Sequence, residues 1–289
     1  MRIAVRAAAV LVSLAIIVAV VWRSRERAAA TDTPVARPIR VLPPDSAIAG
    51  LLESENRVGE YRLRVVRDTV HGDRIVDISL RNRRVFAVSA PDARLEHVGE
   101  DLTGDRVRDL VVLLHTGGVH CCTNAVVLSL GNDSIRRVGI VSGGDGEILF
   151  DDVDGDGVPE VKVQDWRFAY WRDYAFVETA APEVIYRHTA DGYAPACDLM
   201  REPAPSRRVL ESHARELSAG WTHGDPPSDV YSYVLDLVYA GHADLAWTFF
   251  DLAWPPNIPG KDEYKTDLQN MLRGSPCWSP PPAERPQTE

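Results

Sequence analysis

The stretch Asp152-Val-Asp-Gly-Asp-Gly-Val-Pro-Glu160 decides how this part of the chain folds. Carboxylates stand at its first, third, fifth and ninth positions, and the sixth position is a glycine, which permits a sharp bend. Alternate residues of a tight loop point inward. We therefore expect oxygens to meet at one centre from the side chains of Asp152, Asp154, Asp156 and Glu160 and the carbonyl of Val158. Ca²⁺ prefers six to eight such oxygens at roughly 2.3–2.6 Å, so the spacing predicts a calcium site.

The residues on either side of this loop distinguish it from an EF-hand. An EF-hand has a helix on each side and a bidentate glutamate at its twelfth position. Here the twelfth position is Val163, and residues 148–150 and 161–163 are short runs rich in strand-forming residues. We expect the loop to join two strands.

A second copy of the pattern lies 51 residues upstream. It departs at the sixth position, where Arg106 replaces glycine, and at the third, where threonine replaces a carboxylate; both changes weaken a metal site because ligand charge tunes affinity. A fainter echo near residues 69–77 predicts only a hairpin turn at Gly72. The candidate ligands of this upstream copy are Asp101, Thr103, Asp105, Val107 and Asp109.

Two strand-flanked loops of this kind resemble the FG-GAP/VCBS-type repeat, which occurs in integrin α-subunit propellers and in many secreted bacterial proteins. The likeness covers about nine residues of each loop and the strand that follows it. In that family the side chains at the first, third, fifth and ninth positions hold Ca²⁺. The resemblance implies the same role here for Asp152, Asp154, Asp156 and Glu160.

The N-terminus predicts a location outside the cytoplasm. Residues 7–22 carry no charge, and arginines flank them on both sides. Three of these arginines separate the apolar run from the small residues 28–30, so we expect residues 1–23 to be an uncleaved signal anchor in the inner membrane. The alternative is a cleaved signal peptide and a secreted or periplasmic protein. Residues 24–45 contain four prolines and predict a flexible tether.

The charge of the chain narrows the choice of partners. The formal net charge is −10, and the first 45 residues carry a positive surplus, so the body is more acidic than the whole. An acidic body repels the phosphates of nucleic acid, and we expect no nucleic-acid partner. The same charge suits a protein that attracts divalent cations.

Short β-rich runs separated by turns predict an antiparallel all-β domain over residues 46–200, built as a sandwich, a barrel or a partial propeller. A closed propeller needs at least four blades, more than this length provides. Residues 201–278 change to helical spacing and predict a small helical domain, and the proline-rich residues 279–289 predict a disordered tail, giving the α+β class overall. The expected strands are 61–65, 76–80, 85–88, 110–114, 125–130, 138–141, 161–163 and 184–186, and the expected helices begin near 210, 230, 245 and 262.

The cysteines lie partly in the unusual run His115-Thr-Gly-Gly-Val-His-Cys-Cys122. A similar Gly-Gly-x-His-Cys-Cys run occurs in exported bacterial proteins of unassigned function, a resemblance that extends over about residues 60–275 and implies no activity. Outside the cytoplasm cysteines form disulfides, and we expect the pair Cys121/Cys122 to be tied to Cys197 and Cys277. A ring between the two adjacent cysteines and a metal or redox site are the alternatives.

Signatures of the common enzyme classes are missing from the sequence: there is no G-x-S-x-G, H-E-x-x-H, P-loop or G-x-G-x-x-G motif. The sequence therefore predicts a non-enzymatic, membrane-anchored, calcium-binding module with a binding or structural role in the envelope, where it meets an envelope protein or a glycan. The alternative is an envelope hydrolase on the same β scaffold.

Overall fold

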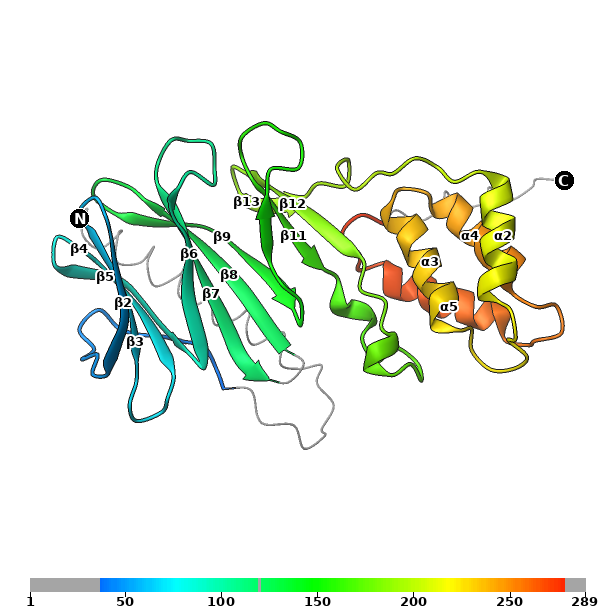
Figure 1. Cartoon of the computed structure of the whole chain (residues 1–289), viewed down its shortest axis with the longest axis horizontal. Coiled ribbons are helices and arrows are strands. Elements are labelled where there is room, and N and C mark those ends of the chain that lie inside the picture. Colours follow the sequence, from blue (N-terminus) through cyan, green and yellow to red (C-terminus); the bar gives the residue numbers. More distant parts are fainter. Residues whose placement is uncertain (1–36, 119–120, 279–289) are drawn as a thin grey trace, which may run out of the picture. The chain divides into compact units, whose positions relative to one another are not determined.

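The computed structural model describes residues 37–118 and 121–278, with the side chain of Cys121 also outside the description. The described residues divide into two compact units, and the boundary in the chain falls between Asp145 and Gly146. Antiparallel sheets occur in both units, and the α-helices lie in the second (Figure 1). The predicted α+β class, with a β domain followed by helices, is confirmed.

The first unit begins with a five-stranded antiparallel sheet in the order β1-β5-β4-β3-β2. A tight turn joins β3 to β4, with Gly72 at φ +74°, which confirms the hairpin predicted there. Strand β1 lies inside the expected tether 24–45, so the end of that segment is part of the fold. The strands are β1 (Arg40–Val41), β2 (Leu51–Val58), β3 (Tyr61–Arg67), β4 (Arg74–Leu80) and β5 (Arg83–Ala90).

Ion pairs explain why the proline-rich segment is held there. The carboxylate of Asp73 is buried, and a buried charge is costly unless it is paired. Arg37 and Arg40 place their guanidinium nitrogens 2.7 and 2.9 Å from its oxygens. The backbone of β1 also pairs with β5, with Arg40 opposite Ser89.

A second sheet of the same unit has the order β6-β7-β8-β9, so each strand pairs with the next in the chain. Strand β7 is buried along most of its length because it lies inside the sheet and carries the run Leu-Val-Val-Leu-Leu. The strands are β6 (Asp92–Glu100), β7 (Asp109–Gly118), β8 (Cys121–Leu130) and β9 (Ile135–Gly144).

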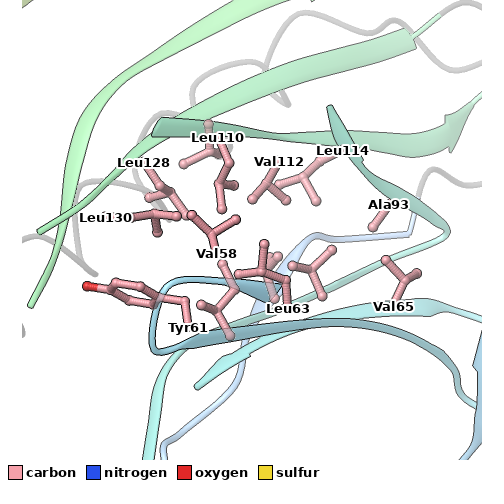
Figure 2. Packing of buried hydrophobic residues seen from close by; sticks show 14 of the residues in the cluster. Val58, Tyr61, Leu63, Val65, Ala93, Leu110, Val112, Leu114, Leu128 and Leu130 are labelled. Carbon is pink, nitrogen blue, oxygen red and sulfur yellow. The ribbon is translucent and has the colours of Figure 1, made fainter. Parts of the chain in front are cut away.

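One hydrophobic core joins these two sheets. Every second residue of β3 and β4 points toward the other sheet, and so does every second residue of β7 and β8. Their side chains meet between the sheets (Figure 2). Burying one leucine or valine side chain contributes roughly 1.5–3 kcal/mol. Among the three architectures expected, the first unit is a sandwich. The most buried residues of this core include Leu63, Val76, Ile78, Leu110, Val112 and Leu128.

The second unit combines a four-stranded antiparallel sheet, in the order β10-β11-β12-β13, with the helices. Two 3-10 helices, η2 (Trp166–Phe168) and η3 (Phe176–Glu178), lie between β11 and β12. The remaining elements are β10 (Leu149–Asp151), β11 (Glu160–Gln164), β12 (Glu183–Thr189), β13 (Gly192–Pro195), α2 (Arg207–Leu217), α3 (Ser228–Tyr239), α4 (Ala243–Ala253) and α5 (Lys261–Leu272).

The division of the chain thus falls near residue 145, whereas the sequence predicts it near residue 200. The reason is that the third sheet and its connections bond to the helices. The hydroxyl of Tyr231 on α3 donates to the carbonyl of Glu178 at 2.8 Å and accepts from the amide of Ala180 at 2.7 Å. A disulfide between Cys197 and Cys277 closes the same unit.

The helices match their predicted positions because their aromatic stripes form the core of this unit. Tyr231, Phe249, Phe250 and Tyr264 are almost completely buried. Helix α3 ends where Gly241 adopts a φ of +85°, a conformation that favours glycine. Within the described ranges no helix is long and apolar enough to cross a membrane. The predicted anchor 1–23 and tail 279–289 lie outside those ranges.

Candidate metal centre

The loop 152–160 joins β10 to β11, as the sequence predicts. The two strands pair in antiparallel register, with Asp151 opposite Glu160 at the base of the loop. The loop is thus the connection of a β-hairpin, which excludes an EF-hand on the geometry of its flanks.

Side chains of the loop hold its backbone. Asp152 accepts hydrogen bonds from the amides of Gly155 at 2.9 Å and Gly157 at 3.0 Å. Asp156 accepts from the amide of Val158 at 2.8 Å. Gly155 and Gly157 have φ values of +77° and +90°, which residues other than glycine adopt only at a cost in conformational energy. The aspartate side chains therefore stabilise the bent backbone of the loop that surrounds them.

Three of the predicted ligands come together in this loop. One carboxylate oxygen from each of Asp152, Asp154 and Asp156 lies within 4.8 Å of the others, and all three residues are exposed. Two oxygens bound to the same Ca²⁺ at roughly 2.3–2.6 Å are at most about 5 Å apart, so the spacing fits the ion. Without a cation, three such charges repel one another.

The fourth predicted side chain, Glu160, lies in the wall of the loop and is not grouped with the three aspartates. It is 2% exposed, and its Oε2 accepts the amide of Val153 at 3.0 Å. Its Oε1 lies 3.8 Å from Nε of Arg187 on β12. Arg187 also contacts Asp154, at 3.2 Å. The sequence does not predict the contact of Arg187 with the loop, because that contact depends on the pairing of β12 with β11.

The upstream loop 101–109, between β6 and β7, repeats this backbone scheme. Asp101 accepts the amides of Gly104 at 2.8 Å and Arg106 at 2.7 Å, in place of Gly155 and Gly157. Asp105 accepts the amide of Val107 at 2.8 Å, as Asp156 does for Val158. The two loops share one hydrogen-bond pattern at a spacing of 51 residues.

The upstream loop shares the backbone geometry of the downstream loop but differs from it in the chemistry of its side chains. Thr103 Oγ1 donates to Asp109 at 3.2 Å, and Arg136 lies 3.6 Å from Asp105. Burial raises the pKa of the Asp109 carboxyl, while the amide of Leu102 opposes this shift. Among the described residues only the downstream loop brings three metal-ligating side chains together.

The structure corrects the predicted cysteine pairing. Cys197 and Cys277 are bonded to each other, with Cα atoms 5.5 Å apart, so neither is tied to the 121/122 pair. The prediction was wrong because the second unit brings Cys197 and Cys277 together from the two ends of an 80-residue stretch. Cys122 is also in a disulfide. His120 and the side chain of Cys121 lie outside the described residues.

His115 uses one of its ring nitrogens within the backbone of its own strand. Its Nδ1 accepts the amide of Gly117 at 3.0 Å, and Cys122 donates its own amide to the hydroxyl of Thr116 at 2.9 Å. These bonds lie at the end of β7 and the start of β8.

Comparisons with known proteins find no family model, no curated protein and no solved structure that matches this chain.

Proposed function

We propose that this protein is a calcium-binding module outside the cytoplasm, held at the inner membrane by its N-terminal segment, with a binding or structural role in the envelope. The observation that carries the proposal is the grouping of the oxygens of Asp152, Asp154 and Asp156 within 4.8 Å. Their hydrogen bonds to the loop backbone fix them before an ion binds, so little ordering is left to oppose binding.

Calcium fits this loop better than magnesium. Mg²⁺ requires nearly ideal octahedral geometry at about 2.0–2.1 Å and usually keeps several waters. Ca²⁺ accepts irregular sets of carboxylate and carbonyl oxygens at longer distances. The loop offers three exposed aspartates, and the carbonyl of Val158 and the carboxylate of Glu160 are the further ligands that we propose.

The disulfide supports a location outside the cytoplasm. Bonds such as Cys197–Cys277 form and persist in oxidising compartments. The metal's role there is to rigidify the hairpin of β10 and β11. Because the site exists only in the folded chain, binding stabilises the fold. The partner that we propose is an envelope protein or a glycan.

Thermal unfolding with and without Ca²⁺ tests the proposal. Calcium at a hundredfold its Kd stabilises the folded state by about 2.7 kcal/mol. Asp156→Asn keeps the acceptor for the amide of Val158 but removes a charge, so we expect most of the gain to disappear. Asp105→Asn makes the same change in the upstream loop and is the matched control. Unfolding curves that coincide in Ca²⁺ and in chelator contradict the proposal.

A further inference from the structure

Arg187 approaches the candidate calcium loop from β12, the strand next to β11. Its guanidinium nitrogen Nη2 lies 3.2 Å from Asp154 and 3.2 Å from Asp198. Its Nε lies 3.8 Å from Oε1 of Glu160. One positive charge therefore faces two acidic residues of the loop and one acidic residue beyond β13.

Glu160 provides an observation independent of the exposed aspartates. Its side chain is 2% exposed, and Oε2 is occupied by the amide of Val153. The other oxygen, Oε1, lies 3.8 Å from Nε of Arg187. A carboxylate on a side chain buried this deeply is costly unless it is paired, so this position calls for a positive charge at close range.

We propose that Arg187 is the internal counter-ion of the 152–160 loop and sets its affinity for Ca²⁺, an inference that rests on the calcium function proposed above. In the metal-free protein the guanidinium offsets the repulsion among the loop carboxylates. A bound Ca²⁺ repels the guanidinium and competes with it for Asp154. Asp198 gives Arg187 a second partner, so the side chain stays paired when Asp154 turns to the metal.

This arrangement predicts that loss of the charge at residue 187 has opposite effects on the stability of the metal-free fold and on the affinity for Ca²⁺. Removing the charge at residue 187 destabilises the metal-free fold, because Asp154 and Glu160 lose their partner. The same change strengthens Ca²⁺ binding, because a unit positive charge near a divalent ion weakens its binding by a factor of roughly three to ten in a water-like dielectric. A residue with a merely structural role changes stability alone.

The test uses the full chain, with calorimetric titration of Ca²⁺ and thermal unfolding in chelator. We expect Arg187→Gln to lower the Kd for Ca²⁺ roughly three- to tenfold and to lower the melting temperature in chelator. Arg187→Lys keeps the charge, and its Kd stays near that of the unchanged protein. Arg136→Gln is the matched control, since it removes a guanidinium that contacts Asp105 of the upstream loop.

The outcomes separate this inference from the proposed function. If the unchanged protein takes up no Ca²⁺, both fail. If it binds Ca²⁺ and Arg187→Gln binds with an equal or higher Kd, the calcium function stands and the counter-ion role is overturned. A Kd that falls as much in Arg136→Gln as in Arg187→Gln also overturns it, because the effect then comes from net charge alone.

Discussion

At the scale of single residues, two loops with one backbone show what a residue type contributes beyond its conformation. Arg106 and Gly157 occupy the sixth position of the two loops and have φ values of +64° and +90°. Arginine pays a conformational cost there that glycine avoids. The sequence indicated Arg106 as a departure from the pattern, but the loop keeps its shape because Asp101 still accepts the amide of residue 106.

Replacing Arg106 with glycine tests this view. Left-handed backbone costs a residue other than glycine about 1–2 kcal/mol, and the extra freedom of glycine in the unfolded chain takes back roughly 0.5–1 kcal/mol. We therefore expect Arg106→Gly to raise the free energy of unfolding of the first unit by up to about 1 kcal/mol in chemical denaturation. Arg108→Gly, two residues on and without positive φ, is the control, and we expect it to destabilise. A loss of stability in Arg106→Gly contradicts the strain argument.

At the scale of elements, the segment with η2 and η3 is attached to the helices by hydroxyl groups. Tyr231 bonds to Glu178 and Ala180, and Tyr174 shares a hydrogen bond of 2.9 Å with Tyr264 on α5. Burial raises the pKa of all three tyrosines, so the hydroxyls stay protonated and available as donors into the alkaline range where an exposed tyrosine ionises. These bonds make the third sheet part of the helical unit.

Removing the hydroxyl of Tyr231 measures that attachment. Tyr231→Phe leaves the buried amide of Ala180 without its acceptor, which costs about 1–3 kcal/mol. Tyr233→Phe is the control in the same helix, because no hydrogen bond of the Tyr233 hydroxyl occurs among the described residues. We expect it to change stability by less than about 0.5 kcal/mol. Denaturant unfolding of the two variants, followed by tryptophan fluorescence, compares the effects; equal losses in both contradict the attachment.

At the scale of the whole molecule, periodicity in the sequence predicts the elements that bury one side. Strand β3 and helices α3 and α4 carry regular apolar positions and were predicted near their bounds. Strand β2 was missed because it is an edge strand, exposed at every position except Val58, so burial leaves no alternation in its sequence. The acidic loop was predicted from local spacing, but Arg187 and the boundary near residue 145 depend on tertiary pairing that no local pattern records.

The disulfide between Cys197 and Cys277 gives the last prediction, since it concerns the second unit as a whole. Cys197 and Cys277 are 80 residues apart, and closing a loop of that size stabilises by about 4.5 kcal/mol in the chain-entropy model. We expect Cys197→Ser/Cys277→Ser to lower the melting temperature of the second unit and to leave the first unit unchanged. Hydrogen exchange followed by mass spectrometry resolves the two units. A uniform loss of protection across both contradicts the division at residue 145.

Peptide mapping of the unreduced protein completes this test. Cys197 and Cys277 are joined to each other, and Cys122 is also in a disulfide. We therefore expect one linked peptide pair containing Cys197 and Cys277, and mapping then identifies the partner of Cys122, for which the sequence offers a ring of adjacent cysteines as one alternative. Reductant added to the double serine variant isolates the effect of that second bond. If that bond is the ring of adjacent cysteines, it closes almost no chain, and chain entropy predicts only a small change in melting temperature.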